Sequence, residues 1–300
     1  MKTDRLYQTV LGCLLLTAGC SDNALIPSLP EGTPLTVSAA ICASGEGRES
    51  ETRAAVAADN GYDRSTFAAG DKIRIIRSRN GSSSTPVDYT LHSASSGSST
   101  GEWKPSVTGT ELLVESGATY QASYPIEYSG IRADQRKAGG EDYRLSNLLE
   151  TPEKVTIGRD GTLSFTGESA FVHKGVKLTL KFSGKNTLSE DFTSMTVTGK
   201  GLYSGGASKD ETVYLYHPGG TGDAKYTWHG IIAPLDSQKS IQVSVTDANG
   251  VVYDVPLTCA RAANTSHYTY TLTLKNNVLV PTGQEIKEWQ SGESNTGILS

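Results

Sequence analysis

Apolar and polar residues alternate in short segments along most of the chain from about residue 35 onward. The clearest segment is 267–275, where tyrosine and leucine occupy one set of positions and threonine occupies the other. A period of two, with aromatic and β-branched residues, indicates a β-strand. Segments with the same pattern predict further strands at 72–75, 176–182, 241–245 and 251–255.

The segment 176–182 has an apolar and a polar face, which are Leu178, Leu180 and Phe182 against Lys177, Thr179 and Lys181. Helical periodicity is nearly absent. Only residues 142–150 place leucines on one side of a helix, and the preceding Gly139-Gly140 pair stops that helix from extending backwards. A short helix is the most that this region predicts.

Turns rich in glycine and serine separate the strand segments, which is typical of β-sandwiches. The sequence therefore predicts an all-β protein with two antiparallel β-sandwich domains. We place the N-terminal domain at residues 35–170 and the C-terminal domain at 171–300, with the boundary near 166–175.

The first twenty residues resemble the signal peptide of a bacterial lipoprotein. A basic start precedes a short apolar run, and Thr17-Ala18-Gly19 then leads into Cys20. This order resembles a lipobox, in which the cysteine is acylated and becomes the first residue of the mature protein. We predict a signal peptide at 1–19, a linker at 20–34 and a membrane anchor through fatty acids, palmitate included, on Cys20.

Composition and charge exclude two classes of protein. The 300 residues carry a net charge of -5, which argues against a nucleic-acid-binding protein that uses a basic surface. No apolar run is long enough to span a bilayer as a helix. Of the four cysteines, Cys42 and Cys259 remain after processing and lipidation, and the sequence leaves open whether they form a disulfide.

A search for catalytic and metal-binding motifs finds no convincing set. Residues 97–101 match the Gly-x-Ser-x-Gly string of hydrolases, but that motif functions between a strand and a helix and here lies in a polar loop. The five histidines form no short-spaced ligand pair. We therefore predict that the protein is not an enzyme, binds no metal and uses no cofactor. A surface cluster of tyrosine or tryptophan that stacks a sugar ring stays open as an alternative.

Several pieces occur in an order that resembles the fimbrillin family of Bacteroidales lipoproteins. After the lipobox these are 51–55, 67–75, Trp103, 120–125, 171–174, 266–274 and 285–292. The resemblance implies two transthyretin-like β-sandwiches and a location at the outer membrane or cell surface, in a fimbrium (pilus).

The resemblance also implies assembly by strand donation, in which a protease removes an N-terminal strand and a neighbouring subunit's strand replaces it. We predict cleavage after Arg53, with Arg48 as the alternative, in a polar segment that packs poorly. The removable strand is expected at Leu35–Ile41, with Leu35, Val37 and Ile41 facing the core. The donated segment is expected at Asn276–Trp289 in the C-terminal tail, through Val278, Val280, Ile286 and Trp289.

The predicted function is that of a structural fimbrial subunit whose partners are other fimbrial subunits, joined by strand exchange. The alternative is a monomeric surface lipoprotein that binds a host glycan or protein as an adhesin. No nucleic acid is expected as a partner. The sequence leaves open a stalk, tip or anchor position within a fimbrium.

Overall fold

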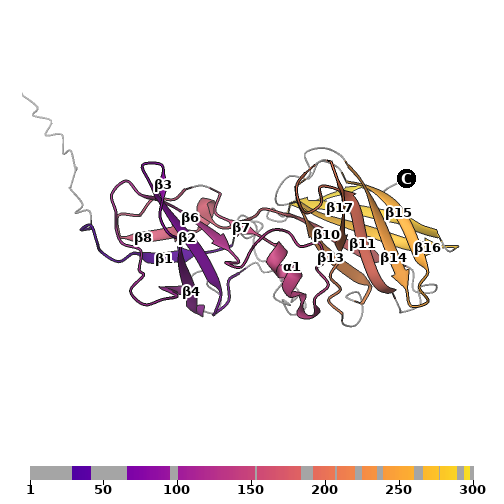
Figure 1. Ribbon diagram of the computed structural model, residues 1–300, viewed down its shortest axis with the longest axis horizontal. Coiled ribbons are helices and arrows are strands. Elements are labelled where there is room, and N and C mark those ends of the chain that lie inside the picture. The colour runs from indigo at the N-terminus through magenta and orange to yellow at the C-terminus, as the bar shows by residue number, and fades with distance from the viewer. Residues whose placement is uncertain are drawn as a thin grey trace, which may run out of the picture.

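The computed structural model describes residues 29–41, 66–94, 101–152, 154–183, 192–206, 208–219, 225–234, 239–259, 266–276, 278–288 and 294–297. Their regular structure is nearly all β-strand and forms two lobes along one axis, joined by a short helix and its flanking segments (Figure 1). The all-β prediction is confirmed. No helix among these residues is long and apolar enough to cross a membrane.

The N-terminal lobe has one large sheet and one small one. The large sheet contains, in spatial order, β5 (Gly101–Pro105), β4 (Val87–Ala94), β2 (Lys72–Arg79), β6 (Thr119–Tyr124), β7 (Leu149–Glu150) and β9 (Val172–His173), with β3 (Ser82–Ser83) paired to β2. All these pairs are antiparallel. The small sheet consists of β1 (Thr36–Ala39) and β8 (Thr162–Phe165), which run parallel. The two sheets enclose a core to which both contribute side chains.

The core of the N-terminal lobe follows the alternation in the sequence. Ile73 and Ile75 are fully buried, as their place in the pattern predicts, while Arg74 between them faces outward to Asp88. Phe67 lies at the centre of an aromatic group and makes edge-on contacts with Trp103, Tyr124 and Phe171, at ring-centroid distances of 5.2, 5.4 and 5.2 Å.

The C-terminal lobe is a sandwich of two sheets. The first contains β12 (Asp210–Tyr214), β11 (Phe192–Lys200), β14 (Lys239–Asp247) and β15 (Val252–Cys259), and the second contains β13 (Thr227–Ile232), β10 (Val176–Phe182), β16 (Ser266–Lys275), β17 (Val278–Glu288) and β18 (Ser294–Gly297). Neighbouring strands are antiparallel except for β10 and β16. Residues of both sheets build one apolar core around Trp228.

Strand β10 differs from a strand with one solvated face. It lies between β13 and β16, and Lys177 and Thr179 on its polar face are only 5% and 3% exposed. The Thr179 hydroxyl lies 3.0 Å from His229 Nδ1 and 2.8 Å from His267 Nε2. These two side chains share a face with their β13 partners Ile231 and His229, and Tyr143 covers that face, with its ring centroid 6.1 Å from that of His229.

The short helix is real but shorter than residues 142–150. Helix α1 spans Glu141–Ser146, after the 3₁₀ turn η1 (Ala138–Gly140), and a second such turn, η2, spans Gly167–Ser169. Both Gly139 and Gly140 have positive φ, which prevents an upstream extension. Asn147 leaves the helical region, and Leu149 belongs to β7 rather than to the helix. Pairing with the sheet therefore overrides helical spacing here.

One segment of the N-terminal half packs against the C-terminal lobe. We call residues 131–147 the strap, and α1 lies within it beside β13 (Figure 1). Tyr143 of the strap stacks on Tyr216, with ring centroids 5.6 Å apart, and joins Ile231 in a small third core. The two large cores otherwise divide between Phe171 and Val176. The predicted domain boundary at 170/171 stays a prediction. The strap precedes this boundary in the sequence but packs against the C-terminal lobe.

Candidate functional site

The position of β1 is the candidate site for strand exchange. On one edge β1 pairs in parallel with β8, and Thr36 and Ala40 donate N–H bonds to the carbonyls of Gly161 and Phe165. On the other edge Leu35 donates to the carbonyl of Leu112 at 2.8 Å. Strand β1 thus forms its backbone hydrogen bonds with residues far from it in sequence. Among the described residues, those that follow β1 directly make no such bond to it.

The side chains of β1 close the N-terminal core. Leu35, Val37 and Ile41 are 7%, 3% and 4% exposed, and Ala39 is fully buried. This is the alternation that the sequence predicts, except that Ala40 on the opposite face is buried as well. Burial of the three larger side chains at about 1.5–3 kcal/mol each contributes about 5–9 kcal/mol. Removal of β1 would expose an apolar slot between β8 and Leu112.

Trp103 belongs to the same apolar core that β1 closes. It is the inward-facing side chain in the middle of β5, and β1 packs directly against β5. Its indole Nε1 is the one side-chain nitrogen or oxygen among the described residues that is buried without a hydrogen-bond partner. A buried N–H group without an acceptor costs about 1–3 kcal/mol.

The predicted processing residues lie elsewhere. Cys20, Arg48 and Arg53 fall outside the described residues, as do Cys42 and Trp289. Arg48 and Arg53 lie between Ile41, at the end of the β1 segment, and Thr66, where the described chain resumes. A cut after either arginine would therefore separate β1 from the rest of the chain.

The structure places the predicted donor residues within a strand of their own lobe. Val278, Val280 and Ile286 belong to β17, which pairs with β16 from Val278 to Glu288. Leu279 of the same strand is buried in the C-terminal core, while Val278 is 60% exposed. Donation of this segment would remove one of the two strands that pair with β16. The described part of the tail beyond it is β18, an edge strand that pairs with β17 at Gln284–Lys287.

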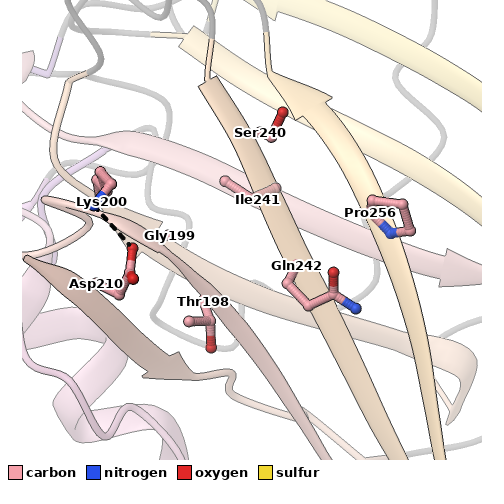
Figure 2. Close-up of a pocket in the computed structure, with 8 residues that line it drawn as sticks. All are labelled: Thr198, Gly199, Lys200, Asp210, Ser240, Ile241, Gln242 and Pro256. Atoms are coloured by element: carbon pink, nitrogen blue, oxygen red, sulfur yellow. Dashed lines mark ion pairs between the residues drawn. The ribbon is translucent and has the colours of Figure 1, made fainter.

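A second feature is a groove on the outer face of the four-stranded sheet (Figure 2). It has a volume of about 520 Å³ and is lined by Thr198, Gly199, Lys200, Asp210, Ser240, Ile241, Gln242 and Pro256. Lys200 Nζ lies 3.5 Å from Asp210 Oδ1 at one end of it (Figure 2). Both groups are largely exposed, so this ion pair contributes little stability. The groove presents hydroxyl and amide groups with no net charge.

The described residues hold no metal-binding cluster. No group of three or more His, Cys, Asp or Glu side chains within them could hold a metal ion. Cys259 is a free, buried thiol, and its sulfur accepts a hydrogen bond from the Tyr270 hydroxyl at 3.1 Å. Burial raises the pKa of the Cys259 thiol to about 11, which makes it a poor nucleophile at neutral pH.

The chain belongs to the fimbrillin-like family, because the model of that family matches residues 52–289. The family match supports a fimbrial role at the cell surface. Comparison with curated protein sequences gives no significant match.

Solved structures share the fold. A protein from Bacteroides uniformis assigned to cell adhesion is 14% identical, with a TM-score of 0.57, and the match covers 88% of this chain and 99% of that one. A protein from Bacteroides ovatus with the same assignment is 16% identical, again with a TM-score of 0.57, over 86% of this chain and 98% of that one. These similarities support the two-sandwich architecture and not a particular ligand.

Sequence reasoning missed two buried polar features of the structure. Trp103 entered only as part of the family pattern, because its unpaired nitrogen depends on which side chains surround it. Gln135, which joins the strap to β13, has no signal in the sequence. It lies in a polar stretch, Arg132–Lys137, that predicts an exposed loop.

Proposed function

We propose that this chain is a structural subunit of a cell-surface fimbrium, exported as a lipoprotein precursor and assembled by strand exchange at the β1 site. The observation that carries the proposal is that β1 closes the N-terminal core while it pairs with no strand adjacent in sequence. Its covalent link to β2 passes through the segment that contains Arg48 and Arg53. After cleavage, only non-covalent contacts hold it.

The contacts of β1 are strong enough to hold a strand and weak enough to be exchanged. The burial of about 5–9 kcal/mol for the larger side chains is opposed by the ordering of the strand backbone, at about 1–2 kcal/mol per residue. A replacement strand with the same alternation gains the same burial and the same backbone bonds. A shift of one residue would turn its apolar side chains away from the core, so the slot selects the register.

We revise the donated segment to the residues beyond β17. Strand β17 is a full partner of β16 and contributes Leu279 to its own core, so its departure would break the C-terminal lobe. Residues 289–300 include Trp289, β18 and the apolar pair Ile298-Leu299, so they lack the regular alternation of Leu35–Ile41 and would bury fewer apolar side chains in the slot. β18 is an edge strand paired on one side to β17. Its release would leave the rest of the sheet intact.

The test compares polymers in the native host. Two variants are expressed, a double Arg48→Ala/Arg53→Ala change and a deletion of residues 289–300, and surface extracts are run on gels with and without boiling. The wild type is expected to give high-mass ladders without boiling, and both variants are expected to give monomers that still reach the surface. Arg159→Ala, at an exposed arginine of the N-terminal lobe, is the matched control and should polymerise normally. Ladders that persist in both variants would refute assembly at this site.

A second function, adhesion through a neutral glycan, is favoured by the groove in Figure 2. Its volume suits a small ligand, and its Thr198, Ser240 and Gln242 groups match the donors and acceptors of sugar hydroxyls. The test is a glycan array with the mature chain and with a Thr198→Val/Gln242→Ala variant. Binding that the variant loses would support the adhesin function. Equal binding by both proteins, or no binding, would reject this groove as the glycan site.

A further inference from the structure

The strand that occupies the β1 site leaves one polar group unsatisfied. Trp103 is 6% exposed, and its Nε1 has no acceptor among the residues that the structure describes. Such a group destabilises the folded state relative to one in which an acceptor is present. The β1 site therefore holds a hydrogen-bond donor that its own strand does not use.

The reason lies in the side chains around the indole. Every inward-facing side chain of the β1 segment is aliphatic, namely Leu35, Val37, Ala39 and Ile41. In the neighbouring strand β4, Leu91 pairs in register with Trp103. The Phe67 ring contacts the indole edge-on, with ring centroids 5.2 Å apart. None of these side chains carries an oxygen or nitrogen. A hydroxyl or amide on the strand at β1 is the simplest source of an acceptor.

We infer that Trp103 is a specificity-determining residue of the β1 site, and that it favours an incoming strand with a hydroxyl or amide side chain at an inward-facing position. This inference rests on the proposed function, in which a strand of a second copy of this chain replaces β1. The replacement then gains a hydrogen bond that the original strand lacks, which favours exchange after cleavage.

The tail of the same chain has the required chemistry. Residues 290–296 are rich in side chains that accept hydrogen bonds, namely Gln290, Ser291, Glu293, Ser294, Asn295 and Thr296. The Leu35–Ile41 segment offers Thr36 and Ser38 instead, but these are on the face that points away from the core. The two segments therefore differ in the hydrogen-bond acceptors that they could offer to the Trp103 indole.

The first test introduces the hydroxyl into the full-length chain, without cleavage or exchange. Val37→Thr and Ala39→Ser are each made with Trp103 present and in a Trp103→Phe background, and urea unfolding midpoints are measured. At least one hydroxyl is expected to lower the midpoint clearly less when Trp103 is present. Val197→Thr, in the C-terminal core, is the control and should lower the midpoint equally in both backgrounds. The inference is overturned if both β1 hydroxyls behave as this control does.

The second test measures exchange itself. The mature chain is cleaved with an arginine-specific protease and mixed with a labelled peptide of residues 35–41, or with the same peptide carrying the hydroxyl that responded in the first test. Fluorescence anisotropy is expected to show about fivefold tighter binding of the hydroxyl peptide, an advantage that Trp103→Phe removes. Equal affinities in both proteins would overturn the inference alone. If neither peptide binds, strand exchange fails as a function, while the unfolding experiment still decides the role of Trp103.

Discussion

Gln135 is expected to be the residue of the strap whose loss most weakens the joint between the two lobes. Its side chain is fully buried and bonds to both backbone groups of Ile231 on the edge strand β13. Nε2 donates to the Ile231 carbonyl at 2.8 Å and to the Arg132 carbonyl at 3.0 Å, while Oε1 accepts from the Ile231 N–H at 2.9 Å. The amide thus continues the hydrogen bonding of a sheet edge.

The change to test is Gln135→Met, which keeps the approximate volume and removes every polar atom. It leaves the N–H and the C=O of Ile231 buried without this partner, and each unsatisfied group costs about 1–3 kcal/mol. We therefore expect a loss of about 2–6 kcal/mol in the free energy of unfolding of the C-terminal lobe. The backbone bond from Gln135 N to the Tyr214 carbonyl, at 3.0 Å, is unaffected by the substitution and limits the loss.

Urea unfolding followed by tryptophan fluorescence measures this loss. The chain has three tryptophans, and changing Trp103 and Trp289 to phenylalanine leaves Trp228, in the C-terminal core, as the reporter. Gln242→Met, at a half-buried position on the outer face of the four-stranded sheet, is the matched control and should shift stability by no more than about 0.5 kcal/mol. A loss for Gln135→Met no larger than that of the control would refute the reasoning.

Two further predictions concern the cysteines. Cys20→Ala is expected to abolish fatty-acid labelling and to release the protein from membranes, because the acyl chains supply the anchor; persistent incorporation of a fatty-acid probe into this variant would contradict the lipoprotein prediction. Cys259 is expected to resist thiol reagents in the native protein, because burial raises its pKa to about 11 and only about one thiol in a thousand is ionised at pH 8. In a variant that begins at Ser21 and carries Cys42→Ser, a thiol-reactive dye should label Cys259 only after denaturation, and rapid native labelling would contradict its burial.

The candidate site was partly predictable from the sequence. The alternation of Leu35, Val37, Ala39 and Ile41 identifies a strand with one apolar face, and the structure buries those side chains. The pairing of that strand was not predictable. A parallel partner more than a hundred residues away, β8, leaves no local pattern, because each strand alone satisfies the same period of two. The donor segment Asn276–Trp289 stays a prediction, since the apolar residues of Val278–Ile286 suit a donated strand as well as they suit the neighbour of β16.

What the sequence determined by itself is the class of the protein and the identity of its strands. Alternation with a period of two is a local property, and it identified Ile73 and Ile75 as core residues before any contact was known. Tertiary structure alone decided which strands are central, which groups are left unpaired and how the lobes join. Burial of Lys177 on β10, the unsatisfied Nε1 of Trp103 and the bonds of Gln135 to β13 all depend on residues distant in sequence. Whether a buried polar group is satisfied depends on its neighbours in space, and those are set only when the chain is folded.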